Sequence, residues 1–496
     1  METLESVLNT LEGAIWAWVG VPVLVVTAVV FTVLTRGVQF RRIPDMFRVI
    51  RDPADFDENG KRDVSAFKSF CISAASRVGT GNIVGVAVAI GAGGPGAIFW
   101  MWVMGLLVGS TSMIESTLAQ VYKTRGDDGF RGGPAYYIRR GLKLPVLAGV
   151  FAALISVVYG FVFNSIQANS IVDALKGSLP NVDPVLLATG TGVVLAALTA
   201  PIIFGGARRI ADVAAAVIPV IAIVYMTVCT IILLGNLSEV PHVLQMIVTE
   251  AFAPQPVGGA ALGFGVVLIT GVQRGLFSNE AGMGSVPNAA AAASVTHPAK
   301  QGLVQTLGVY FDTLVVCSLT AFVILVSNWR MFMDEFAGEY GAGAMTQNAI
   351  AEAFSAFDPL LGPPANHFVT VCIFLFAGTS LFGNYYYGET NILYMFGSRR
   401  LLNVFRILVL AFIVMGAVVP VDLVWSLGNV AMPFMAMVNI LAIVLLAPIA
   451  LKVLRDYDAQ ADRGLDPAFD GDVLTGVDGI ECWPEEQRAP SSQTAP

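Results

Sequence analysis

The residues best suited to bind a ligand lie in two glycine-containing stretches. Residues 76–86 read Ser-Arg-Val-Gly-Thr-Gly-Asn-Ile-Val-Gly-Val within an apolar run over 66–90. Each glycine costs a helix about 1 kcal/mol relative to alanine. Unpaired backbone groups are tolerated at membrane depth only where they line a cavity. We therefore interpret this stretch as a broken membrane helix whose free N–H and C=O groups can bind a ligand.

The second stretch, residues 274–282, reads Arg-Gly-Leu-Phe-Ser-Asn-Glu-Ala-Gly. Three residue types recur at the same spacing, because Arg77, Asn82 and Gly85 match Arg274, Asn279 and Gly282. Corresponding broken helices in two halves of a membrane chain indicate the binding site of a secondary transporter. Two glycine-rich helices that merely pack closely are the alternative.

Such breaks suit an amino acid. The N-terminus of a half-helix offers free N–H groups and a positive dipole end to a carboxylate. The freed carbonyls at a half-helix C-terminus suit an ammonium group or a sodium ion. Two oppositely directed broken helices supply both kinds of group for a zwitterion.

Further polar residues lie inside apolar spans. Asn164 and Gln167 are three residues apart and share a helix face. They either bind polar groups of a ligand or form contacts between helices, worth about 0.6 kcal/mol each. The carbonyl of Phe376 and the hydroxyls of Thr379 and Ser380 place three oxygens on one face, where carbonyls of the first break could complete a sodium site. Hydroxyls in helices also commonly bond back to their own backbone.

Arg77 and Arg274 need partners, because an arginine at mid-membrane costs about 3 kcal/mol on insertion scales. Four acidic residues in apolar spans are available to them: Glu115, Glu280, Asp312 and Glu389. Structural ion pairs between helices are a simpler interpretation of these charges than direct ligand contact.

The elements that position these residues are membrane helices. The chain has 496 residues, is 55% hydrophobic and only 13% charged, whereas a soluble chain has about 25% charged residues. We predict an all-α polytopic membrane protein with eleven transmembrane helices. These spans are residues 13–35, 66–90, 95–122, 145–173, 184–204, 211–235, 260–292, 300–327, 364–396, 402–419 and 422–454.

The distribution of basic residues predicts the orientation of these spans. Lys and Arg gather in alternate loops, at 36–62, 123–143, 208–209, 300 and 399–400, and the other loops are richer in acids. The positive-inside rule then places the N-terminus outside and the C-terminus in the cytoplasm. Ten helices follow the first, and two sets of five must have inverted topology because five is odd.

This reasoning predicts a domain organisation along the chain. The segments are an extra N-terminal helix (1–35), a cytoplasmic amphipathic linker (36–65), a first five-helix repeat (66–235), an external loop (236–259), a second five-helix repeat (260–454) and a disordered cytoplasmic tail (455–496). The long external loop 328–363 is expected to contain short helices that form a lid.

Several other functions are disfavoured. The five cysteines form no CxxC motif, and the three histidines are scattered. No phosphate loop, nucleophile elbow or HExxH motif occurs, so we predict no enzyme and no cofactor. A net charge of -8 without a Lys/Arg-rich run argues against nucleic acid as a partner. An ion channel remains a rival, but it needs a continuous polar pore.

Several motifs together resemble the alanine or glycine:cation symporter family. They are Val78-Gly79-Thr80-Gly81-Asn82-Ile83, the string from Gly93 to Val103 with Trp-Met-Trp, the string from Arg274 to Gly282, Gln167-Ala168-Asn169-Ser170 and the string from His297 to Leu303. The resemblance covers nearly the whole chain. It implies the inverted-repeat fold of the leucine-transporter type with two discontinuous helices, and sodium-driven uptake of small amino acids.

The resemblance also implies roles for residues. The substrate carboxylate would meet the backbone of Gly79 to Gly81 and a side-chain amide, and the amino group would meet a break around Phe277 and Ser278. The expected substrate site comprises Gly79, Thr80, Gly81, Asn82, Asn164, Gln167, Phe277, Ser278 and Asn279. The expected sodium site comprises Ala75, Val78, Phe376, Thr379 and Ser380. Family members often have tryptophan where Asn384 stands, which puts alanine as the best substrate in doubt.

The sequence therefore predicts a sodium-coupled symporter that imports small neutral amino acids across a bacterial-type inner membrane by alternating access. The alternative is a proton-coupled amino-acid transporter of the same fold, with Glu280 or Asp312 as the proton carrier. Neither version performs covalent chemistry.

Overall fold

The computed structural model is mostly helical and describes residues 13–54, 60, 62–126, 129–252, 264–327, 341–355, 358–419 and 421–483. The elements of the first half are η1 (Trp16–Gly20), α2 (Val21–Leu34), α3 (Val38–Arg41), α4 (Ile43–Val49), α5 (Ala66–Arg77), η2 (Gly81–Gly85), α6 (Val86–Gly93), α7 (Gly96–Val121), the antiparallel strands β1 (Thr124–Gly126) and β2 (Gly129–Arg131), α8 (Pro134–Gly141), α9 (Pro145–Val157), η3 (Val158–Phe163), α10 (Asn164–Ser178), α11 (Pro184–Ile203) and α12 (Gly206–Gly235).

The elements of the second half are given next, in chain order. They are α13 (Val240–Ala251), α14 (Phe264–Asn279), α15 (Val286–Ala292), α16 (Pro298–Val309), η4 (Tyr310–Cys317), α17 (Ser318–Val326), α19 (Gly341–Ser355), η6 (Pro359–Leu361), α20 (Gly362–Phe396), α21 (Arg399–Val418), α22 (Val421–Ala461) and η7 (Gly471–Leu474). The turns η2, η3 and η4 are π-helical and continue directly into α-helices.

Ten of the eleven predicted spans correspond, among the described residues, to helices or a bent helix pair long and apolar enough to cross a membrane. Nine helices are long and apolar enough to cross a membrane, and the pair Ala66–Arg77 and Gly81–Gly93 forms a tenth span bent by 56°. The predicted span 260–292 corresponds to α14 and α15, and its first residues lie outside the described part of the chain. The predicted count of eleven is therefore not confirmed.

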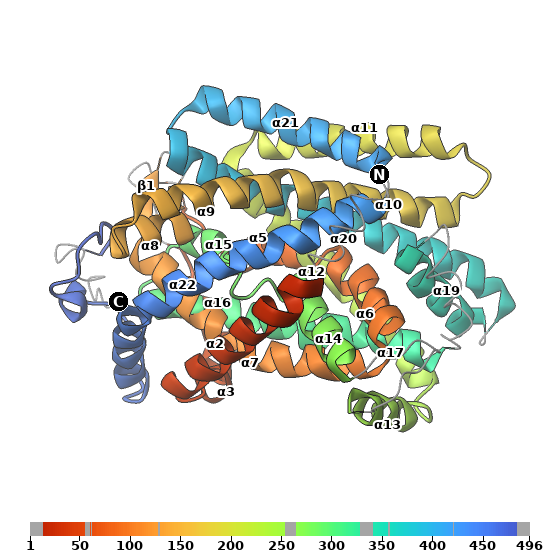
Figure 1. The fold of residues 1–496 in the computed structure, drawn as a ribbon, viewed down its shortest axis with the longest axis horizontal. Helices are drawn as coiled ribbons and strands as arrows, with labels where there is room; N and C mark the ends of the chain where they lie inside the picture. The colour runs from red at the N-terminus through yellow and green to blue at the C-terminus, as the bar shows by residue number, and fades with distance from the viewer. Residues whose placement is uncertain are drawn as a thin grey trace, which may run out of the picture.

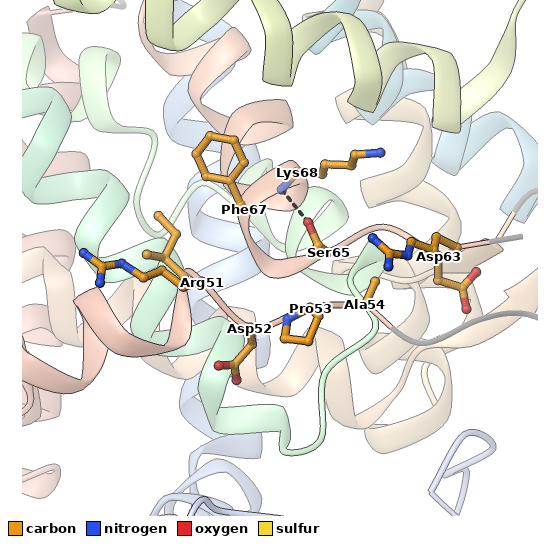
Figure 2. A pocket seen from close by; sticks show the side chains of 10 residues that line it. Arg51, Asp52, Pro53, Ala54, Asp63, Ser65, Phe67 and Lys68 are labelled. Atoms are coloured by element: carbon orange, nitrogen blue, oxygen red, sulfur yellow. Dashed lines mark hydrogen bonds between the residues drawn. The ribbon is translucent and has the colours of Figure 1, made fainter. Parts of the chain in front are cut away.

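Helix boundaries follow from capping residues. Ser65 precedes α5 and its hydroxyl accepts a hydrogen bond from the backbone N–H of Lys68 (3.2 Å; Figure 2). Beside this helix start lies a cavity of about 430 Å³, lined by Arg51, Asp52, Arg62 and Asp63 among others (Figure 2). Asp183 caps α11 in the same way, with its carboxylate 2.8 Å from the N–H of Leu186.

Large apolar side chains on the outer helices face away from the protein. Val146 on α9 is 79% exposed and Val185 on α11 is 67% exposed. In a chain with membrane-spanning helices such surfaces contact lipid. Apart from the half-buried Arg274, the polar residues of the two glycine stretches are instead buried, so the core and not the surface holds the candidate site.

The two ends of the molecule differ in their elements. Figure 1 shows α13 and α19 gathered at one end, while the β1–β2 hairpin and the C-terminal segment lie at the other. Within the predicted loop 328–363, the described residues form α19 and η6, so the expectation of short helices holds for this part. The hydroxyl of Thr346 on α19 donates to the carbonyl of Ile83 (3.3 Å), so α19 packs over the first glycine stretch.

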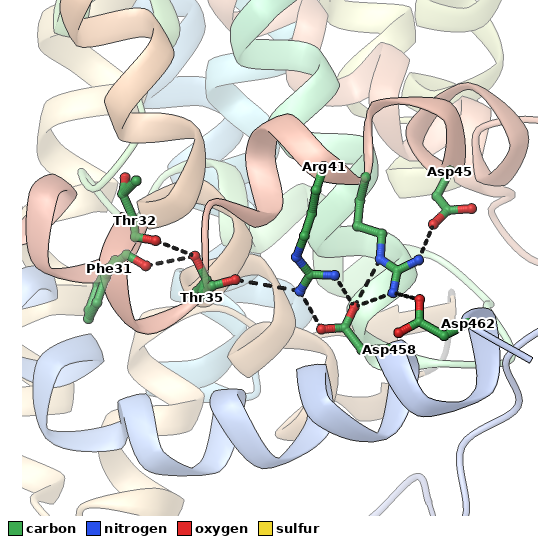
Figure 3. Close-up of polar contacts among 8 residues, drawn as sticks. Phe31, Thr32, Thr35, Arg41, Asp45, Asp458 and Asp462 are labelled. Carbon is green, nitrogen blue, oxygen red and sulfur yellow. Dashed lines mark hydrogen bonds and ion pairs between the residues drawn. The ribbon is translucent and has the colours of Figure 1, made fainter.

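The C-terminal tail corrects one prediction. Disorder was expected over 455–496, but α22 continues to Ala461 and the chain after it remains ordered as far as residue 483; residues 484–496 lie outside the described part. Asp458 forms ion pairs with Arg41 and Arg42 near the N-terminal linker, and Arg42 also pairs with Asp462 (Figure 3). The acidic residues of the tail are therefore held by the basic residues of the loops beside them.

Aromatic residues anchor the rest of the tail. The backbone N–H of Phe469 donates to the carbonyl of Thr296 (2.8 Å), and the indole N–H of Trp483 donates to the carbonyl of Gln120 (2.8 Å). The two rings also pack edge to face, 5.4 Å apart. An acidic and proline-containing composition suggested a solvated extension, but these anchors fasten it to the ends of α7 and α16.

Candidate functional site

The first predicted break is present. Helix α5 ends at Arg77 and η2 begins at Gly81, so residues 78–80 leave the helix. The N–H of Gly79 donates to the side-chain oxygen of Asn82 (3.1 Å). The N–H of Thr80 donates to the Gln167 side chain on α10 (3.2 Å). Two backbone N–H groups of the break are thus bound by neutral amide side chains.

Gly79 is required by a close approach of helices. A Cβ atom at this position would lie 2.4 Å from the Ser380 hydroxyl of α20 and 3.1 Å from the Gln167 oxygen. Neither distance is compatible with an ordinary contact. The first break is therefore in direct contact with both α10 and α20, and the Thr80 hydroxyl beside it is buried without a hydrogen-bond partner.

The second break lies a few residues later than predicted. Helix α14 continues through Asn279, so Gly275, Phe277 and Ser278 are helical and the prediction of a break at Gly275–Ser278 is wrong. The chain leaves the helix over 280–285 instead. Glu280, Gly282 and Gly284 have φ angles of 57°, 81° and 79°. Such left-handed conformations end a helix, whereas Gly275 keeps helical geometry and only lets α14 approach α7.

Two buried carboxylates hold the second break. Glu280 accepts hydrogen bonds from the hydroxyls of Ser76 (2.7 Å) and Ser285 (2.8 Å). Glu115 on α7 accepts from the N–H of Gly282 (2.9 Å) and from the side chain of Asn439 on α22 (2.8 Å). A non-glycine residue with positive φ is uncommon, and such residues gather at functional sites.

The first break and the last turn of α14 meet at a third carboxylate. A Cβ on Gly81 would lie 3.3 Å from Cα of Ser278, so the two segments touch. Asp312 in the π-helical turn η4 accepts from Asn82 Nδ2 (2.7 Å) and from the Ser278 hydroxyl (2.6 Å). Its side chain is completely buried. Asp312 therefore links the first break to the last turn of α14.

The predicted sodium ligands lie next to the first break. The hydroxyls of Thr379 and Ser380 donate to the carbonyl of Phe376 (2.8 and 3.1 Å), and Ser380 also lies 3.5 Å from the carbonyl of Ser76. A Cβ on Gly383 would be 3.0 Å from the carbonyl carbon of Ala75. Val78 follows directly as the C-cap of α5. The structure thus brings the five residues together, with the two hydroxyls bonded to their own helix.

The remaining predicted site residues are less directly placed. Asn164 donates to the carbonyl of Gly160 in its own helix (3.2 Å), although its side-chain oxygen is buried without a partner. Asn279 accepts from the N–H of Ala281 (3.0 Å) and so caps the second break. Asn384 contacts the Ser76 hydroxyl (2.7 Å), and its Nδ2 atom has no partner.

The predicted ion pairs of Arg77 do not form. Its guanidinium donates to the carbonyl of Gln305 (3.2 Å), and among the described residues no carboxylate lies within ion-pairing distance of it. Arg274 stacks over the ring of Trp425, with 5.4 Å to the centroid. Glu389 pairs instead with Arg406 (3.6 Å).

Sequence reasoning named Glu115 only as a partner for arginines, and Asp312 as such a partner or as a proton carrier. Their contacts to the breaks were missed, since nothing in the spacing of distant helices indicates which residues face each other. The available signal was their position, because an acid within an apolar span is a functional candidate by default.

The fold and the site define a secondary transporter: a mostly helical membrane protein with a buried polar site where two interrupted helices meet. The family model described as the sodium:alanine symporter family matches residues 1–471, so the chain belongs to that family. It is accordingly an amino-acid symporter by family and not an enzyme.

Relatives and a solved structure agree with this assignment. The chain is 42% identical to the probable sodium/glutamine symporter GlnT of Bacillus subtilis, over 97% of each chain. It is 43% identical to the amino-acid carrier protein AlsT of the same organism (97% of this chain, 98% of the relative) and 32% identical to the sodium/alanine symporter AgcS of Methanococcus maripaludis (91% and 97%). The crystal structure of MhsT in complex with L-phenylalanine matches with a TM-score of 0.54 at 13% identity, covering 79% of this chain and 99% of that one. This likeness shows the fold, which is of the leucine-transporter type.

Proposed function

We propose that the protein imports neutral amino acids together with sodium. The observation that carries the proposal is the meeting of two interrupted helices at a buried polar site, with helix ends of both polarities. A zwitterion needs an anion site and a cation site at short range, and these ends supply both.

The substrate carboxylate binds at the first break. The N–H groups of residues 79–81 lie at the start of the half-helix that continues into α6, where the dipole is positive. The N–H groups of Gly79 and Thr80 are bonded to amide oxygens of Asn82 and Gln167, which a carboxylate can replace. This exchange gives charge-assisted hydrogen bonds, which are roughly twice as strong as neutral ones.

The substrate ammonium group binds at the end of α14. The last carbonyls of a helix lack partners within the helix. The break at 280–285 leaves the carbonyls of Phe277, Ser278 and Asn279 at a helix C-terminus, with a negative dipole end. Although the break begins at residue 280 and not at 275–278, the carbonyls of Phe277 and Ser278 still lie at a helix end. They can therefore bind the ammonium group, as the family resemblance implies.

Sodium binds between α5 and α20. The carbonyls of Ala75 and Val78 lie at the C-terminal end of α5, and Phe376, Thr379 and Ser380 add three oxygens from α20. All five donors are neutral oxygens, which suits a hard monovalent cation. Sodium at this position draws the first break toward α20, which favours the state that binds substrate from outside.

The substrate class extends beyond alanine. Relatives at 42% and 32% identity are named for glutamine and for alanine. Asn384 has a buried amide nitrogen without a partner near Ser76. A polar asparagine in this region accommodates a substrate side chain larger and more polar than a methyl group. We expect glutamine, alanine and glycine to be the best substrates.

The orientation and the repeats are part of the proposal. Basic loops at the end with the β1–β2 hairpin and the C-terminal segment support a cytoplasmic location of that end in a bacterial plasma membrane. The N-terminus is then outside. The spans after α2 form two inverted sets of five, 66–235 and 260–454, with the breaks in the first span of each set.

Uptake by proteoliposomes tests the proposal. Labelled glutamine, alanine and glycine are offered with and without an inward sodium gradient at constant pH. We expect sodium-dependent accumulation, and a double variant Thr379→Ala, Ser380→Ala that needs much more sodium for half-maximal uptake. Ser156→Ala is the matched control, because that hydroxyl bonds only to its own helix on α9. Uptake that does not depend on the sodium gradient contradicts the proposal, and so does a double variant whose uptake has the same sodium dependence as the wild type.

Proton coupling is the second candidate, and Asp312 is the observation in its favour. Its carboxylate is completely buried and the contacts described for it come from neutral donors. A carboxylate in such surroundings can accept a proton in place of a metal cation. Uptake that follows a pH gradient in sodium-free buffer, and is lost in Asp312→Asn, would favour this version.

A further inference from the structure

A second cavity, at the cytoplasmic end assigned by the basic loops, has the chemistry of an anion site. It measures about 420 Å³ and is lined by Thr124, Arg125, Gly126, Arg131, Tyr136, Arg139, Arg140, Leu393, Tyr394 and Glu481. Four of these ten residues are arginines and only one is acidic. They come from the β1–β2 hairpin, α8, the end of α20 and the C-terminal tail, which are far apart in sequence.

The arginines are held in position by aromatic rings. The guanidinium of Arg139 lies 5.8 Å from the ring centroid of Tyr394, and that of Arg140 lies 5.8 Å from the ring of Tyr136. The two tyrosine rings pack edge to face, 5.1 Å apart. In the part of the chain that the structure describes, Arg139 has no acidic partner within 4 Å, so its charge is available to a ligand.

The protein's own tail already places an anion in this cavity. The Glu481 carboxylate forms an ion pair with Arg140 (2.8 Å) and accepts a hydrogen bond from the Thr124 hydroxyl (2.7 Å). An arginine and a hydroxyl that hold one oxyanion can hold another of similar size. Guanidinium groups also bind phosphate oxygens in the same two-pronged geometry as carboxylates.

The cavity lies where lipid-facing surface begins. Phe396, the last residue of α20, follows Tyr394 by two positions and is 56% exposed. On the other side, α9 begins at Pro145 shortly after α8, and its second residue, Val146, is 79% exposed. A molecule with a phosphate in the cavity can therefore extend acyl chains along apolar helix surfaces. Inorganic phosphate, in contrast, would bind the arginines of the cavity but would make no contact with these apolar surfaces.

We propose that this cavity binds the headgroup of an anionic phospholipid and that Glu481 occupies it when the lipid is absent. Basic pockets between helices on the cytoplasmic side are typical of headgroup sites. The lipid phosphate takes the place of the Glu481 carboxylate on Arg140 and adds Arg139 as a second donor. The tail and the lipid therefore compete for one site.

Binding to the purified full-length protein tests the proposal without any transport readout. Short-chain phosphatidylglycerol is titrated in detergent and detected by native mass spectrometry, beside phosphatidylcholine of the same chain length and inorganic phosphate. One charge near a membrane surface changes affinity about five-fold. We expect Arg139→Gln to weaken phosphatidylglycerol binding by about that factor and Glu481→Gln to strengthen it. Arg400→Gln, an exposed arginine outside the cavity, is the matched control.

The two variants keep the test decisive, because a gain of binding in Glu481→Gln cannot result from misfolding. Equal binding of phosphatidylglycerol by the wild type and both variants overturns the proposal. Saturation by inorganic phosphate at the same concentration, with no gain from acyl chains, also overturns it, because the ligand would then be a soluble anion. Sodium-independent uptake, in contrast, would contradict only the proposed transport function.

Discussion

The two interrupted helices differ in how their breaks are made. The first break is short, covering residues 78–80, and none of its residues has a positive φ angle. The second covers residues 280–285 and includes three left-handed residues. The first is open because other helices approach it closely, whereas the second is open because its own backbone cannot continue a helix.

The groups that bind the breaks differ as well. Backbone N–H groups of the first break are bonded to the neutral amides of Asn82 and Gln167. In the second break, the N–H of Gly282 is bonded to the buried carboxylate of Glu115. A substrate carboxylate can replace a neutral acceptor with a gain in strength, but it cannot displace a carboxylate at a gain. We therefore expect the first break to exchange partners during transport and the second to act as a fixed frame.

The largest effect is expected from Gly79→Ala in the first break. The added methyl group would lie 2.4 Å from the Ser380 hydroxyl and 3.1 Å from the Gln167 oxygen, so these side chains, α20 or the break must move. Displacing a binding site by about 1 Å can cost about 100-fold in rate, and we expect a loss of uptake of that order. Gly378→Ala on α20, where a Cβ would have no neighbour within 4 Å, is the control. Normal uptake in Gly79→Ala would remove the first break from the binding site.

Glu115→Gln tests the frame around the second break. Both carboxylate oxygens accept from N–H donors, Gly282 and Asn439. A glutamine presents an NH₂ group to either the Gly282 N–H or the Asn439 side chain, so two buried donors face each other. This arrangement lowers the stability of the protein by about 1–3 kcal/mol. We expect a clear fall in thermal stability in detergent, beyond that of Glu239→Gln on the exposed N-cap of α13. Wild-type stability with altered substrate affinity would mean that the second break also exchanges partners.

Gly282→Ala separates the observed break from the predicted one. A residue with a side chain at φ 81° loses about 1–2 kcal/mol relative to glycine. Gly275→Ala is the control inside the predicted break, since a Cβ there has an ordinary contact of 3.4 Å with Met101. We expect Gly282→Ala to lower the apparent melting temperature and Gly275→Ala to leave it unchanged or higher. The reverse order would place the break where the sequence suggested.

The sequence alone predicted the spans, the first break and the residues around it, because apolar run length and paired glycines are local signals. It misplaced the second break, since Gly275 and Gly282 look alike in a sequence and only the backbone angle separates them. The bridging role of Asp312 and the capping role of Glu115 depend on which helices face each other. The order of the tail depends on anchors such as Trp483, whose partner Gln120 lies 363 residues away.

The smallest effect is expected where the two breaks are joined by a single hydroxyl. Ser76, in the last turn of α5, lies 2.7 Å from both Glu280 and the Asn384 side chain. A hydroxyl has one proton, and both contacts are to oxygens, Oε1 of Glu280 and Oδ1 of Asn384, so Ser76 donates to one of them at a time. Ser76→Ala removes both contacts and leaves Glu280 bonded to Ser285.

A neutral hydrogen bond contributes about 1 kcal/mol, so Ser76→Ala should change substrate affinity by about five-fold with little loss of stability. Ser76→Thr keeps the hydroxyl and serves as the rescue variant. If the breaks are independent, Ser76→Ala and Glu280→Gln have additive effects on the affinity measured by counterflow. If Ser76 couples the moving break to the fixed one, the double variant Ser76→Ala, Glu280→Gln loses no more affinity than Glu280→Gln alone. In that case the contact between Ser76 and Glu280 is already disrupted by the change at Glu280.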